Sequence, residues 1–423
     1  MDANADDRVP PAPQKPHVVI LGAGFAGLAA AGELNGAAVR TTIVDRHNYN
    51  TFQPLLYQVA TAGLNPGDVA YPVRTYVKRH AGVRFRQGLV TSVDLDAREV
   101  HFEDGGVLPY DYLIVSTGAT TNYFGVTGAQ EQSLAIYTLD DALAVRDRIF
   151  AQLERASALG YAKGELTIVV VGGGPTGVEM AGTLAELRAM ALRTSYRELD
   201  PKMARILLVE RLERLLAGFD ERLSKYASRS LARRGVEVRL GESVEEIAAD
   251  KVVLASGEII ACGLVIWAAG VATNELAHAL DLPRSRGGRI AVDEHLRVAS
   301  RQEVFVAGDA AGTPYGDVLL AQLAQPAIQT GRHAGRQIRS LVEGSATKPF
   351  RYRDKGIMAT IGRRSAVAQL PGHIRLRGTL AWIAWLGLHI FTLIGFRNRL
   401  SVLLNWSWRY LSWRRGPRVI VGG

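Results

Sequence analysis

His17-Val-Val-Ile-Leu-Gly-Ala-Gly-Phe-Ala-Gly27 is the stretch from which the fold is predicted. Its four apolar residues from Val18 to Leu21, three of them β-branched, indicate a buried strand. Three glycines follow in G-x-G-x-x-G spacing: Gly22, Gly24 and Gly27. In that spacing the first glycine makes a tight turn, the second lets a pyrophosphate approach the backbone, and the third lets helix and strand pack closely. The stretch therefore predicts a strand, a phosphate-binding turn and a helix.

A second strand, from Val39 to Val44, ends on Asp45, which lies 23 residues after Gly22. An acidic residue at this distance accepts the ribose hydroxyls of a dinucleotide, while the helix N-terminus holds the pyrophosphate. The alternative is a glycine-rich loop without a nucleotide. The order of strand, turn, helix, strand and acid favours a dinucleotide-binding unit.

The same pattern returns 150 residues later. An apolar strand from Leu166 to Val171 precedes three glycines in the same spacing: Gly172, Gly174 and Gly177. The next strand ends on Glu210, which follows Gly172 by 38 residues instead of the usual twenty or so. We attribute the excess to extra helix and loop, and predict a second dinucleotide-binding unit.

Three further strand ends fit a bound cofactor. Two apolar strands close on small residues, at Gly118 and Gly270, where a bulky side chain would strike a nucleotide. A third ends at Gly308-Asp309, where a carboxylate can reach a ribityl hydroxyl. An ordinary helix cap is the alternative for Asp309. Two Rossmann-like units, one for each nucleotide, predict an α/β flavoenzyme that is fed by a nicotinamide cofactor.

Length and cysteine content limit the remaining classes. A chain of 423 residues suggests two or three domains. The single cysteine, Cys262, excludes both a disulfide framework and a C-x-x-C redox pair, and we expect it to be buried. Residues 1–16 are acidic and proline-rich without an apolar core, so we expect a disordered cytoplasmic tail and not a signal or transit peptide. No metal site is predicted.

The net charge of +9 is concentrated at the C-terminal end. From Lys355 onward there are eleven Lys or Arg and no acid, so residues 1–354 carry a net charge of −2. The same tail holds five of the six tryptophans: Trp382, Trp385, Trp406, Trp408 and Trp413. A basic tail could bind nucleic acid, but arginine together with tryptophan favours an anionic membrane surface. We predict no nucleic-acid partner.

Residues 378–396 form a 19-residue run without a charged residue, within the range of roughly 17–25 residues for a spanning helix. Glycines, tryptophans and His389 make it a poor span, and residues 397–415 mix arginine with tryptophan. We therefore expect residues 378–415 to form a monotopic anchor, with the rings of residues 397–415 at the depth of the headgroups. The alternatives are a single span, or a helix hidden in a soluble core or a dimer interface.

The two fingerprints, the strand ends and Val306-Ala-Gly-Asp309 together resemble the two-dinucleotide-binding-domain flavoproteins. Three more stretches are similar to type II NADH dehydrogenases, the single-subunit NADH:quinone oxidoreductases, and the tail from Leu380 resembles their actinobacterial branch. These stretches are Phe52-Gln-Pro-Leu-Leu-Tyr-Gln-Val-Ala-Thr-Ala-Gly-Leu64, Ala324-Gln-Pro-Ala-Ile-Gln329 and Asp354-Lys-Gly-Ile-Met-Ala-Thr-Ile-Gly362. The resemblance covers about residues 17–415.

The resemblance implies a quinone site at Gln325 and Gln329, which match the A-Q-x-A-x-Q motif of the family. Residues four apart share a helix face, so both amides can reach one quinone carbonyl and the flavin edge. Pro326 predicts that they lie in and next to the first turn of a helix. Two exposed surface glutamines are the alternative. The resemblance also implies that Lys355 lines the quinone pocket. The alternative is that Lys355 is a solvated surface charge.

Glu179 matches the G-x-x-G-V-E pattern of the family, which places it near the nicotinamide. The alternative is an acid in the first turn that merely favours the helix dipole. Glu210 favours NADH, because a carboxylate repels a 2′-phosphate, although Arg211 and Arg214 could accept one.

The resemblance implies two Rossmann-like domains, one inserted in the other, plus a C-terminal helical membrane-anchoring region. We expect an FAD-binding domain from 17–125 and 286–348, an NADH-binding domain from 126–285 and the anchoring domain from 349–423. The implied activity is hydride transfer from NADH to FAD and then electron transfer to a membrane quinone, without proton pumping, at the cytoplasmic face of the membrane. Whether the protein forms a homodimer is left open by the sequence.

Two other functions remain as alternatives. A soluble NADH-dependent ferredoxin or rubredoxin reductase would share both nucleotide domains but has no use for the basic tryptophan tail. A non-enzymatic NADH-sensing flavoprotein could instead bind a partner through that tail.

Overall fold

The computed structural model describes residues 15–200 and 202–412, which form two compact units. Unit 1 combines the residues up to Asn48 with Pro72–Ala119 and Thr273–Tyr352. Unit 2 combines Tyr49–Tyr71, Thr120–Ala272 and the residues from Arg353. The chain therefore leaves unit 1 and returns to it, as expected for one dinucleotide-binding unit inserted in another. The segment 49–71, which the expected boundaries assign to the first domain, groups with unit 2, and so does the C-terminal part of the chain.

Unit 1 is built on a six-stranded sheet of order β21-β22-β9-β1-β2-β5. The strands are β1 (His17–Leu21), β2 (Arg40–Asp45), β5 (Val83–Gln87), β9 (Tyr112–Val115), β21 (Arg297–Val298) and β22 (Arg301–Val306). All neighbours are parallel except β21 and β22. Every residue of β1 is buried, which explains its continuous apolar run, because a central parallel strand is covered on both faces. The predicted first strand and the strand ending on Asp45 are confirmed.

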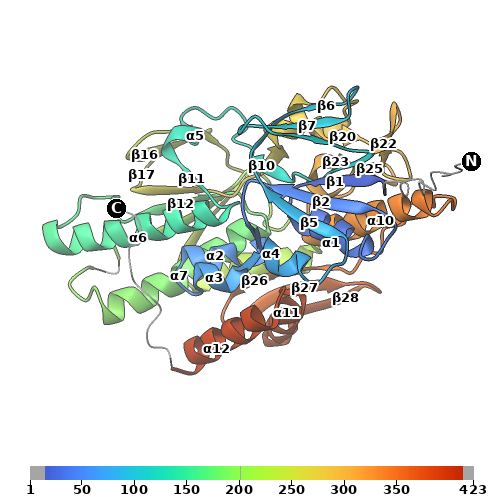
Figure 1. Ribbon diagram of the computed structural model, residues 1–423. Coiled ribbons are helices and arrows are strands. Elements are labelled where there is room, and N and C mark those ends of the chain that lie inside the picture. Colours follow the sequence, from blue (N-terminus) through green and yellow to red (C-terminus); the bar gives the residue numbers. More distant parts are fainter. Residues whose placement is uncertain (1–14, 201, 413–423) are drawn as a thin grey trace, which may run out of the picture. The chain divides into compact units, whose positions relative to one another are not determined.

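Helices α1 (Phe25–Glu33) and α10 (Ala324–Val342) pack closely in unit 1 (Figure 1). A Cβ atom at Gly331 would lie 2.1 Å from the Ala26 carbonyl oxygen, and one at Gly335 would lie 2.5 Å from that of Ala30. Only glycine fits at both positions, which lie four residues apart and therefore on one helix face. The two glycines thus fix α10 against the helix that follows the first fingerprint.

Unit 2 is built on a five-stranded parallel sheet of order β11-β18-β12-β13-β14. Its strands are β11 (Leu134–Ala135), β12 (Ile168–Val171), β13 (Ile206–Glu210), β14 (Val236–Leu240) and β18 (Leu264–Trp267), and its long helices are α6 (Leu139–Leu159), α7 (Pro175–Thr194) and α8 (Glu221–Arg233). Helix α7 has 20 residues where α1 has 9, which confirms extra helix as a source of the long gap before Glu210. Cys262 is buried, as expected, and burial raises the pKa of its thiol to about 12, so it is unreactive at neutral pH.

The C-terminal part of unit 2 contains an antiparallel sheet and two helices. The sheet is formed by β26 (Ile357–Gly362), β27 (Ser365–Leu370) and β28 (Ile374–Gly378), and the helices are α11 (Thr379–Thr392) and α12 (Phe396–Ser412). Strand β26 packs on α7, where a Cβ atom at Gly182 would lie 2.1 Å from the Ile361 carbonyl oxygen. Helix α11 packs on β27 and β28 (Figure 1).

The uncharged run 378–396 is not one helix. Helix α11 ends at Thr392, and α12 begins at Phe396 after Gly395, whose φ angle is +87°. No helix in the described part of the chain is both long and apolar enough to cross a membrane.

The expected headgroup depth is wrong for Trp406, and Trp385 of the preceding helix is buried as well. Trp385 and Trp406 are buried within unit 2, because they pack against other aromatic rings. Trp408 is 63% exposed. Trp413, like most of the expected N-terminal tail 1–16, lies outside the described residues.

Shorter elements complete the two units. They are β3 (Tyr49–Thr51), η1 (Gln53–Leu55), α2 (Leu56–Ala60), α3 (Pro66–Val69), β4 (Ala70–Pro72), α4 (Val73–Val77), β6 (Val90–Asp94), β7 (Glu99–Phe102), β8 (Val107–Pro109), β10 (Ala119–Thr121), α5 (Ala129–Gln132), β15 (Val244–Ile247), β16 (Lys251–Leu254), β17 (Ile259–Ala261), β19 (Val271–Thr273), α9 (Glu275–Ala279), η2 (Arg286–Gly288), β20 (Ile290–Ala291), η3 (Gly308–Ala310), β23 (Ala311–Gly312), β24 (Pro314–Tyr315) and β25 (Val318–Leu319).

Candidate functional site

The first fingerprint forms a cradle at the carboxyl end of β1. Gly22 has a φ angle of +100°, and a Cβ atom there would lie 2.4 Å from the Ser116 carbonyl oxygen. A Cβ atom at Gly27 would lie 1.9 Å from the Gly22 carbonyl oxygen. At Gly24, by contrast, it would meet nothing within 4 Å, and this residue is the N-cap of α1 without a side-chain cap. The open space therefore faces the free amides of a helix N-terminus, as a pyrophosphate site requires.

The second fingerprint repeats this geometry in unit 2. Gly172 has a φ angle of +108°, and a Cβ atom there would lie 2.6 Å from the Ala268 carbonyl oxygen. A Cβ atom at Gly177 would lie 1.8 Å from the Gly172 carbonyl oxygen. At Gly174, the N-cap of α7, it would again meet nothing within 4 Å. Both cradles therefore leave space at the one glycine where a pyrophosphate approaches the backbone.

The acid at the end of the second strand is also placed alike in the two units. Asp45 accepts hydrogen bonds from the Ala23 amide at 2.7 Å and the His47 amide at 2.8 Å. Glu210 accepts from the Gly173 amide and, at 2.7 Å, from the Leu212 amide. Each carboxylate is thus fixed beside its glycine turn, with lone pairs left for ribose hydroxyls.

Asp309 and Gly118 lie at the same edge of the unit 1 sheet as the first cradle, after β22 and β9. Asp309 lies inside η3, whose N-cap is Ala307, so the helix-cap alternative is wrong. The positive charge of Arg289 interacts with its carboxylate. In unit 2, Gly270 follows β18, and a Cβ atom there would lie 2.6 Å from the Phe124 ring.

Gln325 and Gln329 both lie on α10, and Pro326 is in its first turn as predicted. The N-cap, Leu323, makes no side-chain cap. Both glutamines are half-buried, so neither is an exposed surface residue. The Oε1 atom of Gln325 is buried and has no hydrogen-bond partner among the described residues. A buried polar atom without a protein partner is costly, so a hydrogen-bond donor from outside the chain would fit at this position.

Glu179 is buried in unit 2, with 8% of its surface exposed. It is the fifth residue of α7, beyond the first turn, so the alternative of an acid that serves the helix dipole is wrong. Its Oε1 atom accepts a hydrogen bond from the Thr360 amide at 3.2 Å. The Trp385 indole also faces the carboxyl, although its N–H makes no hydrogen bond of ordinary geometry. Burial dominates and raises the pKa of Glu179 to about 8, so this group holds a proton at neutral pH.

A group of aromatic rings, which we call the aromatic cover, surrounds Trp385: Phe52, Tyr57, Trp385, His389 and Trp406. Trp385 stacks on His389 with 3.9 Å between ring centroids, and its ring lies 5.7 Å from that of Trp406 and 6.5 Å from that of Tyr57. The His389 ring meets Phe52 edge-on at 6.1 Å. Burial lowers the pKa of His389 to about 4, so the cover is uncharged at neutral pH.

Sequence reasoning missed Thr360 and the aromatic cover. One signal was available: Trp385 and His389 lie four residues apart in the run 378–396 and therefore share a helix face. Two polar-edged rings on one face favour a face that packs against protein over one that contacts lipid. The contact with Glu179 itself joins residues about 200 positions apart in the chain and leaves no local signal.

The four residues predicted to carry the chemistry are divided between the units. Gln325 and Gln329 belong to unit 1, and Glu179 and Lys355 belong to unit 2. The Lys355 side chain is exposed and makes no hydrogen bond or ion pair within the described ranges, as its alternative of a solvated charge expects.

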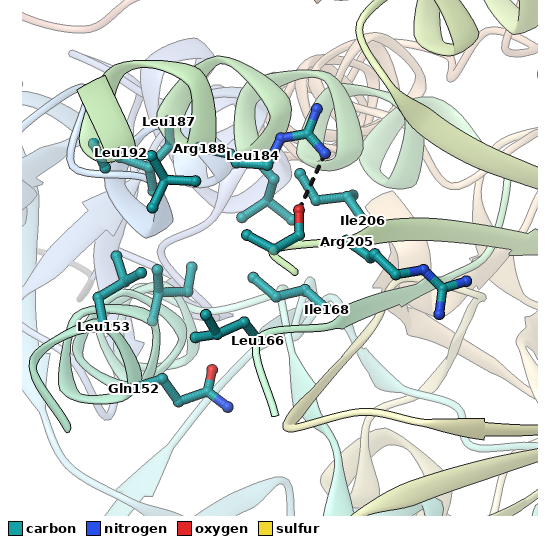
Figure 2. A pocket seen from close by; sticks show the side chains of 13 residues that line it. Gln152, Leu153, Leu166, Ile168, Leu184, Leu187, Arg188, Leu192, Arg205 and Ile206 are labelled. Atoms are coloured by element: carbon teal, nitrogen blue, oxygen red, sulfur yellow. Dashed lines mark hydrogen bonds between the residues drawn. The ribbon is translucent and has the colours of Figure 1, made fainter. Parts of the chain in front are cut away.

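An apolar cavity of about 40 Å³ in unit 2 is not the nucleotide site. Figure 2 shows it between α6, α7 and the beginnings of β12 and β13, where Ile168 and Ile206 line it. Both cradles lie instead at the carboxyl ends of strands, where nucleotides bind in parallel sheets. The Arg188 guanidinium at the wall of the cavity donates to the Ala204, Arg234 and Gly235 carbonyl oxygens and so is satisfied by the protein. No group of three or more His, Cys, Asp or Glu residues that could hold a metal occurs in the part of the chain that is described.

The sequence pattern of the pyridine nucleotide-disulphide oxidoreductase family fits residues 16–336, and that of the NDH2 C-terminal domain fits residues 355–415. The type II NADH:quinone oxidoreductase Ndh of Mycobacterium tuberculosis is 37% identical, over 97% of this chain and 91% of its own length. The chain belongs to the type II NADH:quinone oxidoreductase family. NdhA of the same organism, with the same description, is 38% identical over 96% of this chain and 89% of its own.

The fold agrees with this membership. The structure of NDH2 from Plasmodium falciparum in complex with NADH superimposes with a TM-score of 0.89 at 20% identity, and covers 96% of this chain and 100% of that one. The resemblance based on the two fingerprints and the three shorter stretches is therefore confirmed, as is the predicted fold class.

Proposed function

We propose that the two units divide the work of an NADH:quinone oxidoreductase, with FAD held by unit 1 and NADH by unit 2. The duplicated cradle carries this proposal, because each unit has an open second glycine at an uncapped helix N-terminus and an acid fixed beside it. Bound FAD supplies the two-electron chemistry that joins the NADH and quinone half-reactions.

The residues next to each cradle support the assignment of FAD to unit 1 and NADH to unit 2. In unit 1, Asp309 and the uncapped start of α10 extend the polar groups past the dinucleotide cradle, as the ribityl chain and ring of FAD require. In unit 2, Glu210 offers a carboxylate to the ribose and disfavours a 2′-phosphate. Unit 2 thus fits NADH.

We propose that Gln325 and Gln329 bind the quinone, since Gln325 carries a buried amide oxygen without a partner in the described chain. Rotation of the amide presents its N–H instead, and a donor suits a quinone carbonyl that gains negative charge during reduction. From the family resemblance we also propose that Lys355, whose side chain is exposed in unit 2, contributes to quinone binding.

Glu179 is proposed to supply a proton. The overall reaction consumes NADH, quinone and one further proton, because the hydride brings two electrons and only one of the two protons in the quinol. A buried carboxyl with a pKa of about 8 holds such a proton at neutral pH and can release it when charge develops nearby.

We propose that α11 and α12 attach the protein to an anionic membrane surface as a monotopic anchor, at the cytoplasmic face. Their exposed apolar side chains include Leu380, Ile383, Phe391, Phe396, Leu400, Leu403, Leu404 and Trp408. Neighbouring cations at Arg375, Arg377, Arg397 and Arg399 would favour anionic headgroups. A homodimer is the other way to cover this face, and sedimentation with and without vesicles distinguishes the two.

The test of the activity is NADH oxidation by the purified protein with and without a quinone, followed at the flavin absorbance. Flavin bleaching by NADH and fast recovery on addition of quinone are expected. An NADH-sensing flavoprotein would bleach without steady turnover. A ferredoxin reductase would need a protein acceptor, and it would not explain the C-terminal domain.

A further inference from the structure

The C-terminal helices reach further into unit 2 than an anchor requires. Trp385 is 1% exposed and faces the carboxyl of Glu179, while Trp406 packs against Trp385 from α12. An anchor needs only the outward face of such helices, which carries residues such as Phe391, 75% exposed. The inward face of α11 and α12 is therefore unexplained by membrane binding.

A row of hydrogen bonds holds α12 to the segment 49–71. The buried Asp68 carboxylate accepts from the Ser401 hydroxyl at 2.6 Å and from the Asn405 amide at 2.8 Å. The Trp406 indole donates to the Gln58 Oε1 atom at 2.7 Å, and Gln58 in turn donates to the Tyr57 hydroxyl. We call this row the polar latch. The bond between Trp406 and Gln58 is buried, and a buried polar group needs a defined partner, so α12 has one seating on this segment.

The carboxyl of Glu179 lies under the rings that this latch holds. On its own side, the carboxyl meets α7 and the Thr360 amide of β26. From α11 it meets the Trp385 indole, behind which stand the neutral His389 and the Tyr57 ring. Among the described residues no charged group contributes to its environment. Exclusion of water by Trp385 is thus the feature that distinguishes this carboxyl from an exposed one.

We propose that Trp385 is a positioning residue for Glu179: it keeps water from the carboxyl, and the polar latch makes this seal depend on the seating of the C-terminal helices. The inference rests on the proposed role of Glu179 as a proton donor. Its consequence is that the helices which bind the membrane also set the proton affinity of a group in the active site. Detachment of α11 would admit water and let Glu179 ionise at a lower pH.

The experiment follows the infrared C=O band of the protonated Glu179 carboxyl against pH in the holoenzyme, with the band assigned by its loss in Glu179→Gln. Trp385→Ala should lower the midpoint pH of this band by at least about one unit, a tenfold loss of proton affinity. Trp385→Phe, which keeps an apolar ring, should retain most of it. Trp408→Ala is the matched control, because Trp408 is exposed on the same tail and should leave the midpoint unchanged.

Ser401→Ala loosens the latch without touching the cover and should shift the midpoint in the same direction by a smaller amount. If Trp385→Ala does not fold, Ser401→Ala tests whether the seating of the C-terminal helices sets the proton affinity of Glu179. An unchanged midpoint in Ser401→Ala and in every folded Trp385 variant would overturn the inference. The role of Glu179 is tested separately: if Glu179→Gln leaves flavin reoxidation by quinone at the wild-type rate, that role fails, whatever the midpoint does.

Discussion

Replacement of Glu179 by Gln should make the stability of the protein less dependent on pH. Gln is the neutral isostere of the protonated carboxyl, and its amide oxygen can keep the hydrogen bond from the Thr360 amide. The wild-type carboxyl has a folded pKa of about 8 against an ordinary value of 4.5. Between these values the folded state binds a proton that the unfolded chain has released. The wild type therefore loses stability relative to Glu179→Gln as the pH rises from 4.5 through 8.

The magnitude follows from the size of the shift. At 1.36 kcal/mol per pH unit, a rise from 4.5 to about 8 corresponds to roughly 5 kcal/mol. This value is an upper bound, because any opening that admits water lets the carboxylate ionise at lower cost. A change of 1 kcal/mol shifts the melting temperature by roughly 2–4 °C in a unit of 150–250 residues, so a difference of about 10 °C is expected.

The assay is thermal unfolding of wild type and variant in parallel from pH 4.5 to pH 9. The two curves should meet at the acidic end, separate between pH 4.5 and about 8 with the variant more stable, and run parallel above that. Glu245→Gln is the control, since it removes an exposed carboxylate that makes no side-chain hydrogen bond or ion pair within the described ranges, and thus tests the change of charge alone. Two parallel lines across the whole range would refute the reasoning, because they would show that Glu179 has the same proton affinity in the folded and unfolded states.

Four other variants test the remaining proposals. Gln325→Leu or Gln329→Leu should slow flavin reoxidation by quinone roughly tenfold to a hundredfold, because one charge-assisted hydrogen bond of about 1.5–3 kcal/mol is lost. Flavin bleaching by NADH should be nearly unchanged. Equal reoxidation rates in the wild type and both variants would show that the quinone does not bind at this helix. Glu210→Ala should raise the ratio of NADPH to NADH use in steady-state kinetics, because the repulsion of a 2′-phosphate is lost, and an unchanged ratio would assign the preference to another residue. Phe391→Ser combined with Leu404→Ser should weaken sedimentation with anionic vesicles, because both exposed apolar side chains are lost while the latch residue Ser401 is left intact. Full pelleting of the double variant would place the membrane contact elsewhere.

The parts of the fold that depend on local rules could be predicted from the sequence. Gly22, Gly27 and their counterparts Gly172 and Gly177 are each required by a close approach to a backbone carbonyl, and spacing alone identifies them. The strand ending on Asp45 follows from apolar patterning and length. The long α7 follows from the residue count before Glu210.

What could not be predicted depends on contacts between distant segments. The burial of Glu179 comes from β26 and α11, which lie about 180 and 200 residues further along the chain. The tryptophans of the tail share one composition, yet Trp385 and Trp406 turn inward because the segment 49–71 offers them rings and an amide, while Trp408 stays exposed. Composition cannot distinguish the buried tryptophans from the exposed one, because it does not show which distant segment each tryptophan will pack against.

The assignment of FAD to unit 1 and NADH to unit 2 can be tested by filling each cradle at its open glycine. A side chain at Gly24 or Gly174 meets no protein atom within 4 Å as a Cβ, so Gly24→Val and Gly174→Val should both fold and should obstruct only the ligand. Flavin content per chain and the stopped-flow rate of flavin bleaching by NADH are measured on both variants. Gly24→Val should purify with little flavin, whereas Gly174→Val should keep a full flavin complement and bleach slowly. A full flavin complement in Gly24→Val together with flavin loss in Gly174→Val would contradict the assignment.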